Sequence, residues 1–234
     1  MHLSTTLQEV RLAKVSPWLD SRSAIKKQPV AHCQVNSLGI IGDEQAEVFH
    51  GGEDRALLQF DSAHYQALAQ HFPESAHLFI PGSFGENLVA TGMSEANLCI
   101  GDIVNIGSAV LQVTQPRKPC YKLNFVFEQP TISKFVQDHG MAGWFYRVLV
   151  PGTISAGDVM TVTERPEPEW PLSKVQHYLN IELLNEDAMK QLLTLESLAE
   201  NIKGTFQKRL ENGKAEDWDR RLYKGGVVPL ELRV

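Results

Sequence analysis

The chain has 234 residues, 43% of them hydrophobic, which is enough to bury a core in one large domain or in a large and a small one. Its formal net charge of -6 gives no support for a nucleic-acid partner or an anionic membrane surface, since both favour basic patches. The sequence contains neither an apolar run long enough to cross a bilayer nor the apolar stretch of a signal peptide. We therefore expect a cytoplasmic protein that binds neither nucleic acid nor membrane.

Short runs of β-forming residues, bounded by turn residues, dominate the chain as far as residue 165. These runs span residues 48–49, 56–60, 103–106, 110–113 and 159–162. Many short strands without regularly alternating helices predict a mostly antiparallel barrel or sandwich rather than a doubly wound sheet. Two helices, at about residues 62–71 and 132–139, are expected to interrupt the strands.

A proline-rich segment at residues 164–171 separates this β-rich part from a helical part, and we interpret it as a stiff linker. Beyond it, apolar residues recur with helical spacing in three stretches, which predicts a small three-helix unit. We therefore expect a barrel domain at residues 1–165, a helical domain at residues 166–224 and, after the Gly-Gly pair, a flexible tail at residues 225–234.

Local capping residues predict where these three helices begin. Ser173 with Gln176 fits a capping box at the start of the first helix. Asn185 is a suitable N-cap for the second helix. Ser197 with Glu200 fits a second capping box, ahead of the third helix.

The three cysteines differ in their surroundings. An odd and small number argues against a disulfide framework, and it excludes a four-cysteine zinc or iron–sulfur site built from this chain alone. Cys33 and Cys99 fit a buried structural role, because Cys99 lies in an apolar run. Three cations lie within three residues of Cys120: Arg117, Lys118 and Lys122. Since nearby cations favour the thiolate, which binds metals and acts as a nucleophile, the sequence assigns the chemistry to Cys120.

Three further segments combine glycine with polar or aromatic residues. Residues 50–57 (HGGEDRAL) offer backbone donors and a forked guanidinium, although a tight turn with an exposed Asp54–Arg55 ion pair explains them as well. Residues 82–88 (GSFGENL) suit either a polar ligand or a surface hairpin turn. Residues 139–147 (HGMAGWFYR) could supply an aromatic wall, but the start of a core strand explains most of this segment.

Several common catalytic motifs are absent from the sequence. It contains no G-x-G-x-x-G, no P-loop, no G-x-S-x-G and no H-E-x-x-H. A self-contained nucleotide-dependent oxidoreductase or a serine hydrolase is therefore not expected.

Taken in this order, HGGEDRAL, GSFGENL, GDIVNIG, QPRKPCYKL and the three-helix unit resemble the MOSC family, and most closely its YiiM-like branch, over roughly residues 7–224. The resemblance implies a mostly β fold with α elements: a MOSC-type β-barrel, similar to the pyruvate kinase β-barrel, followed by the helical unit. It also implies a bound molybdenum cofactor (molybdopterin) and a cysteine that binds molybdenum or carries sulfur, which here is Cys120. Pyridoxal phosphate binding is a second property attached to the family as a whole.

The resemblance also assigns site residues. The catalytic candidates are Cys120, which would also be the metal ligand, His50 and Glu86, and Asp54 is a further candidate proton donor. The candidate cofactor-binding residues are Gly51, Gly52, Asp54, Arg55, Ser83, Gly85, Asn87, Arg117 and Lys122. Among them, the cations suit the phosphate of molybdopterin, and Glu86 and Asn87 suit the hydrogen-bonding edges of the pterin.

The expected activity is the reduction of N-hydroxylated compounds, such as hydroxylaminopurines or amidoximes. Because the chain lacks iron–sulfur cysteines and a nucleotide-binding motif, electrons would come from a separate reductase, which the helical unit could dock. One alternative is a sulfur carrier or transferase that holds a persulfide on Cys120. Another is a carrier that binds molybdopterin and hands it on without catalysis.

Overall fold

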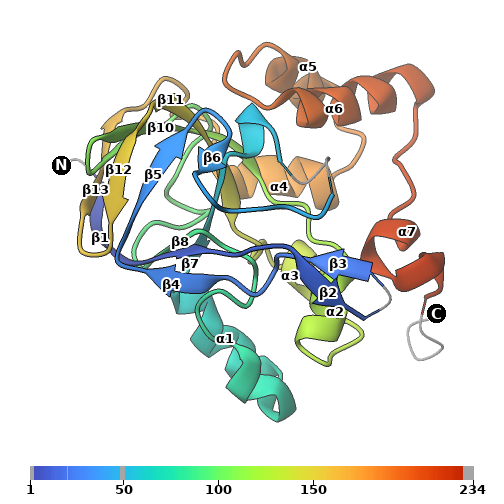
Figure 1. Ribbon diagram of the computed structural model, residues 1–234. Coiled ribbons are helices and arrows are strands. Elements are labelled where there is room, and N and C mark those ends of the chain that lie inside the picture. The colour runs from blue at the N-terminus through green and yellow to red at the C-terminus, as the bar shows by residue number, and fades with distance from the viewer. Residues whose placement is uncertain (1–2, 20, 48–50, 229–234) are drawn as a thin grey trace.

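A closed β-barrel forms the centre of the computed structural model, which describes residues 3–19, 21–47 and 51–228 (Figure 1). Seven strands follow one another around it, and β13 pairs with β1 to close the ring. In spatial order these strands are β13 (Val159–Glu164), β9 (Ile103–Ile106), β10 (Ala109–Pro116), β11 (Trp144–Val150), β7 (Leu57–Asp61), β8 (Leu88–Ala90) and β1 (Ser4–Leu12). The predicted barrel is therefore confirmed.

The barrel is mixed rather than purely antiparallel. Strands β7 and β8 pair in parallel, whereas the other neighbouring pairs of the ring are antiparallel. The parallel pair arises because helix α1 (Ala63–His71) and the 3-10 helix Pro73–Leu78 lie between the two strands, so the chain crosses over before it returns. The predicted strands at 56–60, 103–106, 110–113 and 159–162 and both predicted helices are present, while residues 48–49 lie outside the described residues.

Short elements surround the barrel. Strand β4 (Gln28–Val30) pairs with β1, β2 (Ser16–Trp18) pairs with β3 (Ser21–Ser23), and β5 (His32–Asn36) pairs with both β12 (Gly152–Ser155) and β6 (Gly39–Ile40). The 3-10 helix Glu53–Arg55 precedes β7. Helices α2 (Lys122–Val126) and α3 (Ile132–Asp138) fill the connection from β10 to β11.

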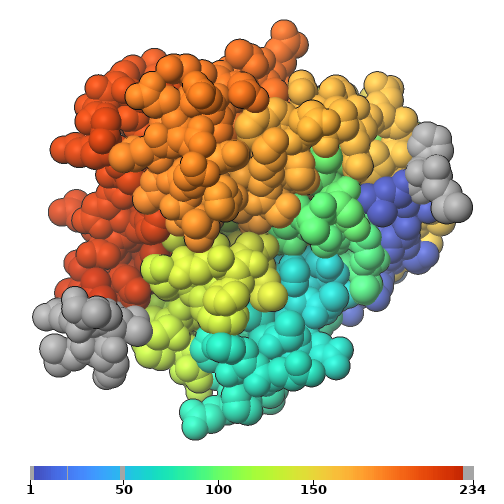
Figure 2. Space-filling view, turned by 180° about the vertical axis from the view of Figure 1, so that it is seen from behind, coloured from blue at the N-terminus to red at the C-terminus, as the bar shows by residue number. Residues whose placement is uncertain are grey.

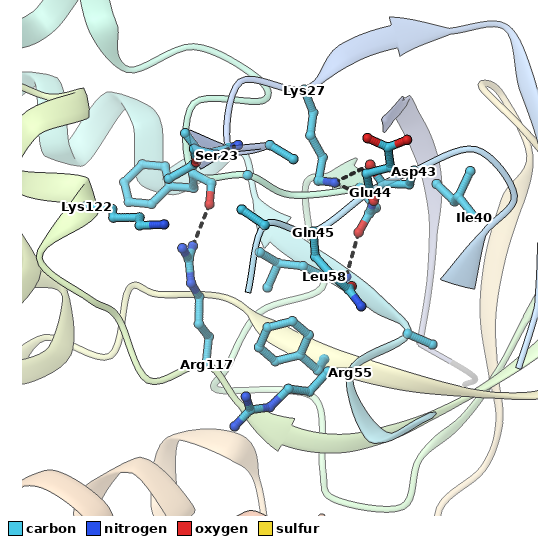
Figure 3. A pocket seen from close by; sticks show the side chains of 18 of the residues that line it. Ser23, Lys27, Ile40, Asp43, Glu44, Gln45, Arg55, Leu58, Arg117 and Lys122 are labelled. Atoms are coloured by element: carbon cyan, nitrogen blue, oxygen red, sulfur yellow. Dashed lines mark hydrogen bonds and ion pairs between the residues drawn. The ribbon is translucent and has the colours of Figure 1, made fainter. Parts of the chain in front are cut away.

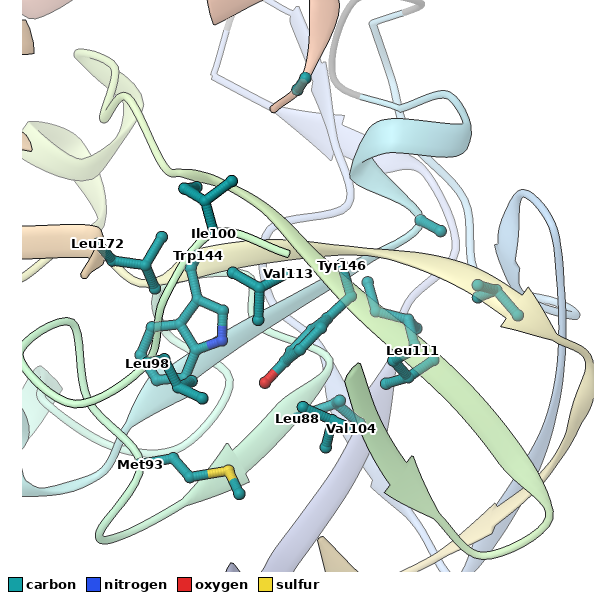
Figure 4. Packing of buried hydrophobic residues seen from close by; sticks show 14 of the residues in the cluster. Leu88, Met93, Leu98, Ile100, Val104, Leu111, Val113, Trp144, Tyr146 and Leu172 are labelled. Carbon is teal, nitrogen blue, oxygen red and sulfur yellow. The ribbon is translucent and has the colours of Figure 1, made fainter. Parts of the chain in front are cut away.

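Two apolar clusters stabilise this arrangement. The larger one fills the barrel, where Trp144 and Tyr146 of β11 are fully buried, and Leu172 from the C-terminal helices reaches the same cluster (Figure 4). The smaller one lies between the barrel and α1, α2 and α3, and in it Phe84 stacks on Phe60 with ring centroids 4.2 Å apart. Since Phe84 is completely buried, the GSFGENL segment is anchored to the core and is not a free surface turn.

Four helices follow the proline-rich segment: α4 (Leu172–Asn180), α5 (Glu186–Leu193), α6 (Glu200–Asn212) and α7 (Asp219–Leu222). The first three are the predicted unit, and their apolar faces share the larger core cluster with the barrel. Figure 2 shows them in continuous contact with the rest of the molecule. Helix α7 was not predicted, because its sequence DRRL is polar and too short to show an apolar stripe. Within the described ranges, the structure contains no helix that is long and apolar enough to cross a membrane.

Two of the three predicted helix starts were wrong. Helix α4 begins after Pro171, and the backbone N–H of Ser173 donates to Glu95 O at 2.7 Å instead of to a local side chain. Helix α6 begins after Ala199, so Ser197 is not its N-cap. The N–H of Ala199 donates to Thr114 O of β10, and the N–H of Glu200 donates to Asp54 Oδ2. Asn185 does cap α5, since its Oδ1 accepts from Ala188 N at 2.9 Å.

Candidate functional site

A pocket opens where β10 ends and the chain turns toward α2 (Figure 3). Five stretches that are far apart in the sequence contribute to its wall, and Phe145 of β11 adds an aromatic ring. The stretches lie within residues 23–27, 38–46, 55–58, 84–87 and 115–122. All four segments that the sequence analysis singled out therefore contribute to one place, the segment at residues 139–147 through Phe145, and residues 23–27 and 38–46 were not foreseen.

Cys120 is the cysteine of this pocket. It is half-buried and lines the wall, whereas Cys33 and Cys99 are buried and do not line it. Burial raises the pKa of Cys33 to about 11, and it also raises the pKa of Cys99. Two of the thiols thus lie in surroundings that keep them protonated and inaccessible, and only Cys120 is available to a ligand.

Cations dominate the polar wall around Cys120. The lysines and arginines that line the pocket are Lys27, Arg55, Arg117, Lys118 and Lys122. Arg117 is fixed by a hydrogen bond from Nη1 to Phe84 O at 2.7 Å, so a backbone carbonyl of the GSFGENL segment orients this guanidinium (Figure 3). Burial lowers the pKa of Arg117, and the nearby Cys120 and Glu86 oppose that shift. Arg55 lies over the ring of Phe145, 5.9 Å from its centroid.

Two of the lining lysines were not among the predicted site residues. Lys118 donates from Nζ to Thr205 Oγ1 of α6 at 3.2 Å, and burial next to Arg221 lowers its pKa to about 8. Lys27 is buried and paired with Asp43 on the opposite wall (Figure 3). Burial lowers the pKa of Lys27, and the Asp43 carboxylate acts against that change. Lys118 belongs to the predicted cysteine segment, but no local pattern marks Lys27.

The remaining pocket residues among the candidates are Gly85, Asn87 and Lys122. The amide of Asn87 is fully engaged: Oδ1 accepts from Leu58 N at 3.1 Å, and Nδ2 donates to Asp43 Oδ2 at 2.8 Å. Asn87 therefore orients the Asp43 carboxylate within the wall. Lys122 is buried, with Nζ 3.4 Å from Arg22 O and 3.6 Å from Glu47 Oε1.

Glu86 is completely buried behind the wall and does not line the pocket. It accepts hydrogen bonds from Tyr65 OH and from Gly82 N, while its Oε2 has no partner among the described residues. Burial raises the pKa of Glu86, and the bond from Tyr65 opposes this. Its assignment as a catalytic residue stays a prediction.

Other candidates lie outside the pocket lining. Asp54 forms an ion pair with Arg147, and the hydroxyl of Ser83 donates to Ile80 O at 2.6 Å. Gly51 and Gly52 precede the 3-10 helix Glu53–Arg55 and do not contribute to the lining either. His50 lies outside the described residues. The roles predicted for these residues remain predictions.

The pocket wall also contains a polar side chain that has no hydrogen-bond partner in the described part of the chain. Gln115, at the end of β10, is fully buried, and its Oε1 and Nε2 have no hydrogen-bond partner within the described ranges. Buried amides are normally paired, so such a group suits a ligand with both donors and acceptors. The described residues contain no group of three or more His, Cys, Asp or Glu side chains suited to a metal ion. Cys120, the cations around it and the unpaired Gln115 amide fit a metal that arrives with its own organic ligand and takes one sulfur ligand from the protein.

Comparisons with known proteins agree with this architecture. Residues 46–161 match the MOSC domain, and residues 170–213 match the three-helix domain of YiiM-like proteins. Protein YiiM of Escherichia coli is 39% identical over 228 residues, which cover 92% of this chain and 97% of that protein. A protein named reductase from Gibberella moniliformis is 43% identical over 145 residues, covering 62% of this chain but only 26% of the reductase.

Solved structures of similar proteins share the whole fold. The crystal structure of YiiM from Escherichia coli has a TM-score of 0.80 at 33% identity and covers 95% of this chain and 98% of that one. YiiM from Geobacillus stearothermophilus has a TM-score of 0.76 at 31% identity, over 88% of this chain and 99% of that one. The barrel, the helical unit and the extent of these matches show that the chain belongs to the MOSC-domain family, in its YiiM-like branch.

Proposed function

We propose that this protein binds the molybdenum cofactor in the Cys120 pocket and reduces N-hydroxylated compounds, such as hydroxylaminopurines or amidoximes. The observation that carries the proposal is the position of Cys120. This thiol is the half-buried one of the three cysteines, and it lines a pocket that also presents five lysines and arginines. A soft anionic ligand beside several cations suits a metal whose organic ligand carries a phosphate.

Different residues of the pocket would bind different parts of such a cofactor. Cys120 would bind the metal, and Arg117 and Lys118 would neutralise the phosphate. Gln115 would take the hydrogen-bonding edges of the pterin, because both of its polar atoms are otherwise unpaired among the described residues. When bound, the molybdenum cofactor supplies the two-electron redox centre.

The reaction requires electrons from elsewhere. Conversion of an N–OH group to N–H takes up two electrons and two protons and releases one molecule of water. The chain has three cysteines, which excludes a four-cysteine iron–sulfur site, and two of them, Cys33 and Cys99, are buried outside the pocket. The sequence also has no nucleotide-binding motif, so we propose a separate reductase as the donor. The name of the Gibberella moniliformis relative supports a reductive reaction.

The test compares Cys120→Ala with a matched control, Cys33→Ala, which changes a buried cysteine outside the pocket. Both variants and the unmodified protein are purified from cells that make the cofactor, and molybdenum and pterin are measured per chain. Turnover of a hydroxylaminopurine is then followed with a chemical reductant. We expect cofactor and activity in the unmodified protein and in Cys33→Ala, and loss of both in Cys120→Ala. Full activity in Cys120→Ala would contradict the proposal.

The same preparations separate the two alternative functions. A mass increment of one sulfur atom on Cys120 in the protein as isolated would indicate a sulfur carrier or transferase. Bound cofactor without turnover of any N-hydroxylated compound, even with reductant present, would indicate a carrier that passes molybdopterin on.

A further inference from the structure

The segment around Cys120 is held by the far C-terminal part of the chain. Helix α7 lies beside α2 and α3 in Figure 1, about 100 residues away from the cysteine in sequence. Arg221 donates from Nη1 to Pro119 O at 2.6 Å, one residue before Cys120. The backbone carbonyl of the same Arg221 accepts from Tyr121 N at 2.7 Å, one residue after it. One residue of α7 thus holds both neighbours of the cysteine.

Arg221 also connects this segment to α3. Its Nη2 donates to Gln137 Oε1 at 2.6 Å, so the two arms of the guanidinium fork bridge the cysteine segment and the helix behind it. On the α3 side, Ser133 Oγ donates to Cys120 O at 2.7 Å. Each peptide group next to the thiol is therefore fixed by a partner from α7 or α3, and the sulfur itself is left to face the pocket.

Helix α7 is in turn tied to the helical unit. Arg209 of α6 is buried and donates from Nε to Glu216 Oε2 at 2.8 Å, which anchors the connection between α6 and α7. Arg209 also donates to Leu179 O of α4 at 2.8 Å. Since Asn124 Nδ2 donates to Leu222 O at 2.9 Å, the far end of α7 is fixed to α2 as well. The helical unit thereby reaches the cysteine through a short, well-anchored helix.

We propose that Arg221 is a positioning residue of the site, and that helix α7 acts as a clasp that sets the direction and exposure of the Cys120 sulfur. The inference rests on the proposed function only in taking Cys120 as the reactive group. Through such a clasp, the C-terminal helices would position the Cys120 sulfur without contacting a substrate.

The experiment uses the full chain without cofactor, so that it stays separate from the test of molybdenum binding. Arg221→Lys keeps the charge, but a single ammonium cannot bridge Pro119 and Gln137 as the fork does. Arg221→Met removes charge and donors together. Arg220→Met, which changes the exposed neighbouring arginine on the same helix, is the matched control.

Two measurements report on the segment around Cys120: amide hydrogen exchange and thiol alkylation. Hydrogen exchange at the Tyr121 amide should accelerate by about tenfold or more in Arg221→Lys and Arg221→Met, because its acceptor sits on a loosened helix. Alkylation of Cys120 by iodoacetamide should accelerate several-fold in Arg221→Lys, since the half-buried sulfur becomes more exposed while the local charge is kept. Arg220→Met should change neither rate.

A role in overall stability alone would give a different pattern, with faster exchange spread over the barrel and a lower melting temperature. Unchanged exchange at Tyr121 together with unchanged alkylation in Arg221→Lys and Arg221→Met would overturn the proposal, whether or not the protein binds molybdenum. If the Arg221 variants unfold, Gln137→Met in the full chain removes the second partner of the guanidinium fork and leaves Arg221 in place, and it should show the same two accelerations.

Discussion

Asp54 accepts a hydrogen bond through Oδ2 from the backbone N–H of Glu200, the first residue of α6, at 3.2 Å. Its Oδ1 accepts from Arg147 Nε of β11 at 2.9 Å. A carboxylate at this place also complements the positive end of the helix. Asp54 thus joins the segment ahead of β7, the barrel wall and the helical unit, and it does so outside the pocket lining.

Replacement of Asp54 by Asn should therefore destabilise the protein. We expect Asp54→Asn to lower the free energy of unfolding by about 1–2 kcal/mol, because it weakens a charge-assisted bond and the favourable interaction with the helix end. Urea unfolding of the cofactor-free protein measures the change. Glu53→Gln, at the exposed neighbouring position, should stay within about 0.5 kcal/mol of the unmodified protein. Unchanged stability combined with lost cofactor would instead favour a direct role in the site.

The way Asp54 caps α6 explains why sequence patterns found this helix but misplaced its start. The apolar stripes of α4, α5 and α6 are properties of each segment, and they were predicted correctly. Asn185 caps its own helix and was also found. The N–H groups at the starts of α4 and α6 are instead satisfied by residues far away in the sequence, such as Glu95 and Asp54, and no pattern within either helix records such a distant partner.

The site residues, too, were predicted where they are close in sequence and missed where they come from distant parts of the chain. Arg117 and Lys122 were predicted to surround Cys120 because they are close to it in sequence, and they do line its pocket. Lys27 and Asp43 reach the opposite wall from a region without a recognisable motif, and Arg221 reaches the cysteine segment from the end of the chain. Contacts of this kind depend on the closed barrel and on the placement of α7, so they become visible only in the folded structure.

The cysteines should differ sharply in reactivity. In the native protein at about pH 8, we expect iodoacetamide to modify Cys120, because Cys33 and Cys99 are buried and burial raises the pKa of both. Peptide mass spectrometry after short exposure locates the label. All three cysteines should react in urea, which serves as the control for intrinsic reactivity. Labelling of Cys33 or Cys99 before Cys120 would show that the burial of these thiols is not maintained in solution.

The unpaired Gln115 side chain should lower the free energy of unfolding of the protein without a ligand. Replacement by Met, which has a similar volume, removes two buried polar atoms that lack partners within the described ranges. We expect Gln115→Met to raise the free energy of unfolding of the cofactor-free protein by about 1 kcal/mol and to lower the amount of cofactor retained. Gln112→Met on the same strand is the matched control. It should be destabilising, because Gln112 bonds Ser197 and Arg147, each at 3.1 Å.

The ion pair between Arg209 and Glu216 should make stability depend on acid pH. Burial alone would raise the pKa of Glu216, but hydrogen bonds from Arg209 and Trp218 lower it from 4.5 to about 2. Since the folded-state pKa lies below the ordinary value, the pair stabilises the folded protein above about pH 4.5. That contribution is lost progressively as the pH falls toward about 2.

Glu216→Gln isolates this effect. At neutral pH the variant should be less stable by about 1–3 kcal/mol, a modest figure because the Glu216 side chain is 40% exposed although Arg209 is buried. Between about pH 4.5 and about pH 2, the unmodified protein should lose stability more steeply than the variant, so that the two unfolding curves converge in acid. Parallel pH profiles for the two proteins would show that Glu216 does not titrate with folding. If the protection of the Tyr121 amide, taken relative to its intrinsic exchange rate at each pH, also falls in this pH range, acid weakens the connection from α6 to α7, and with it the clasp on Cys120, before the barrel unfolds.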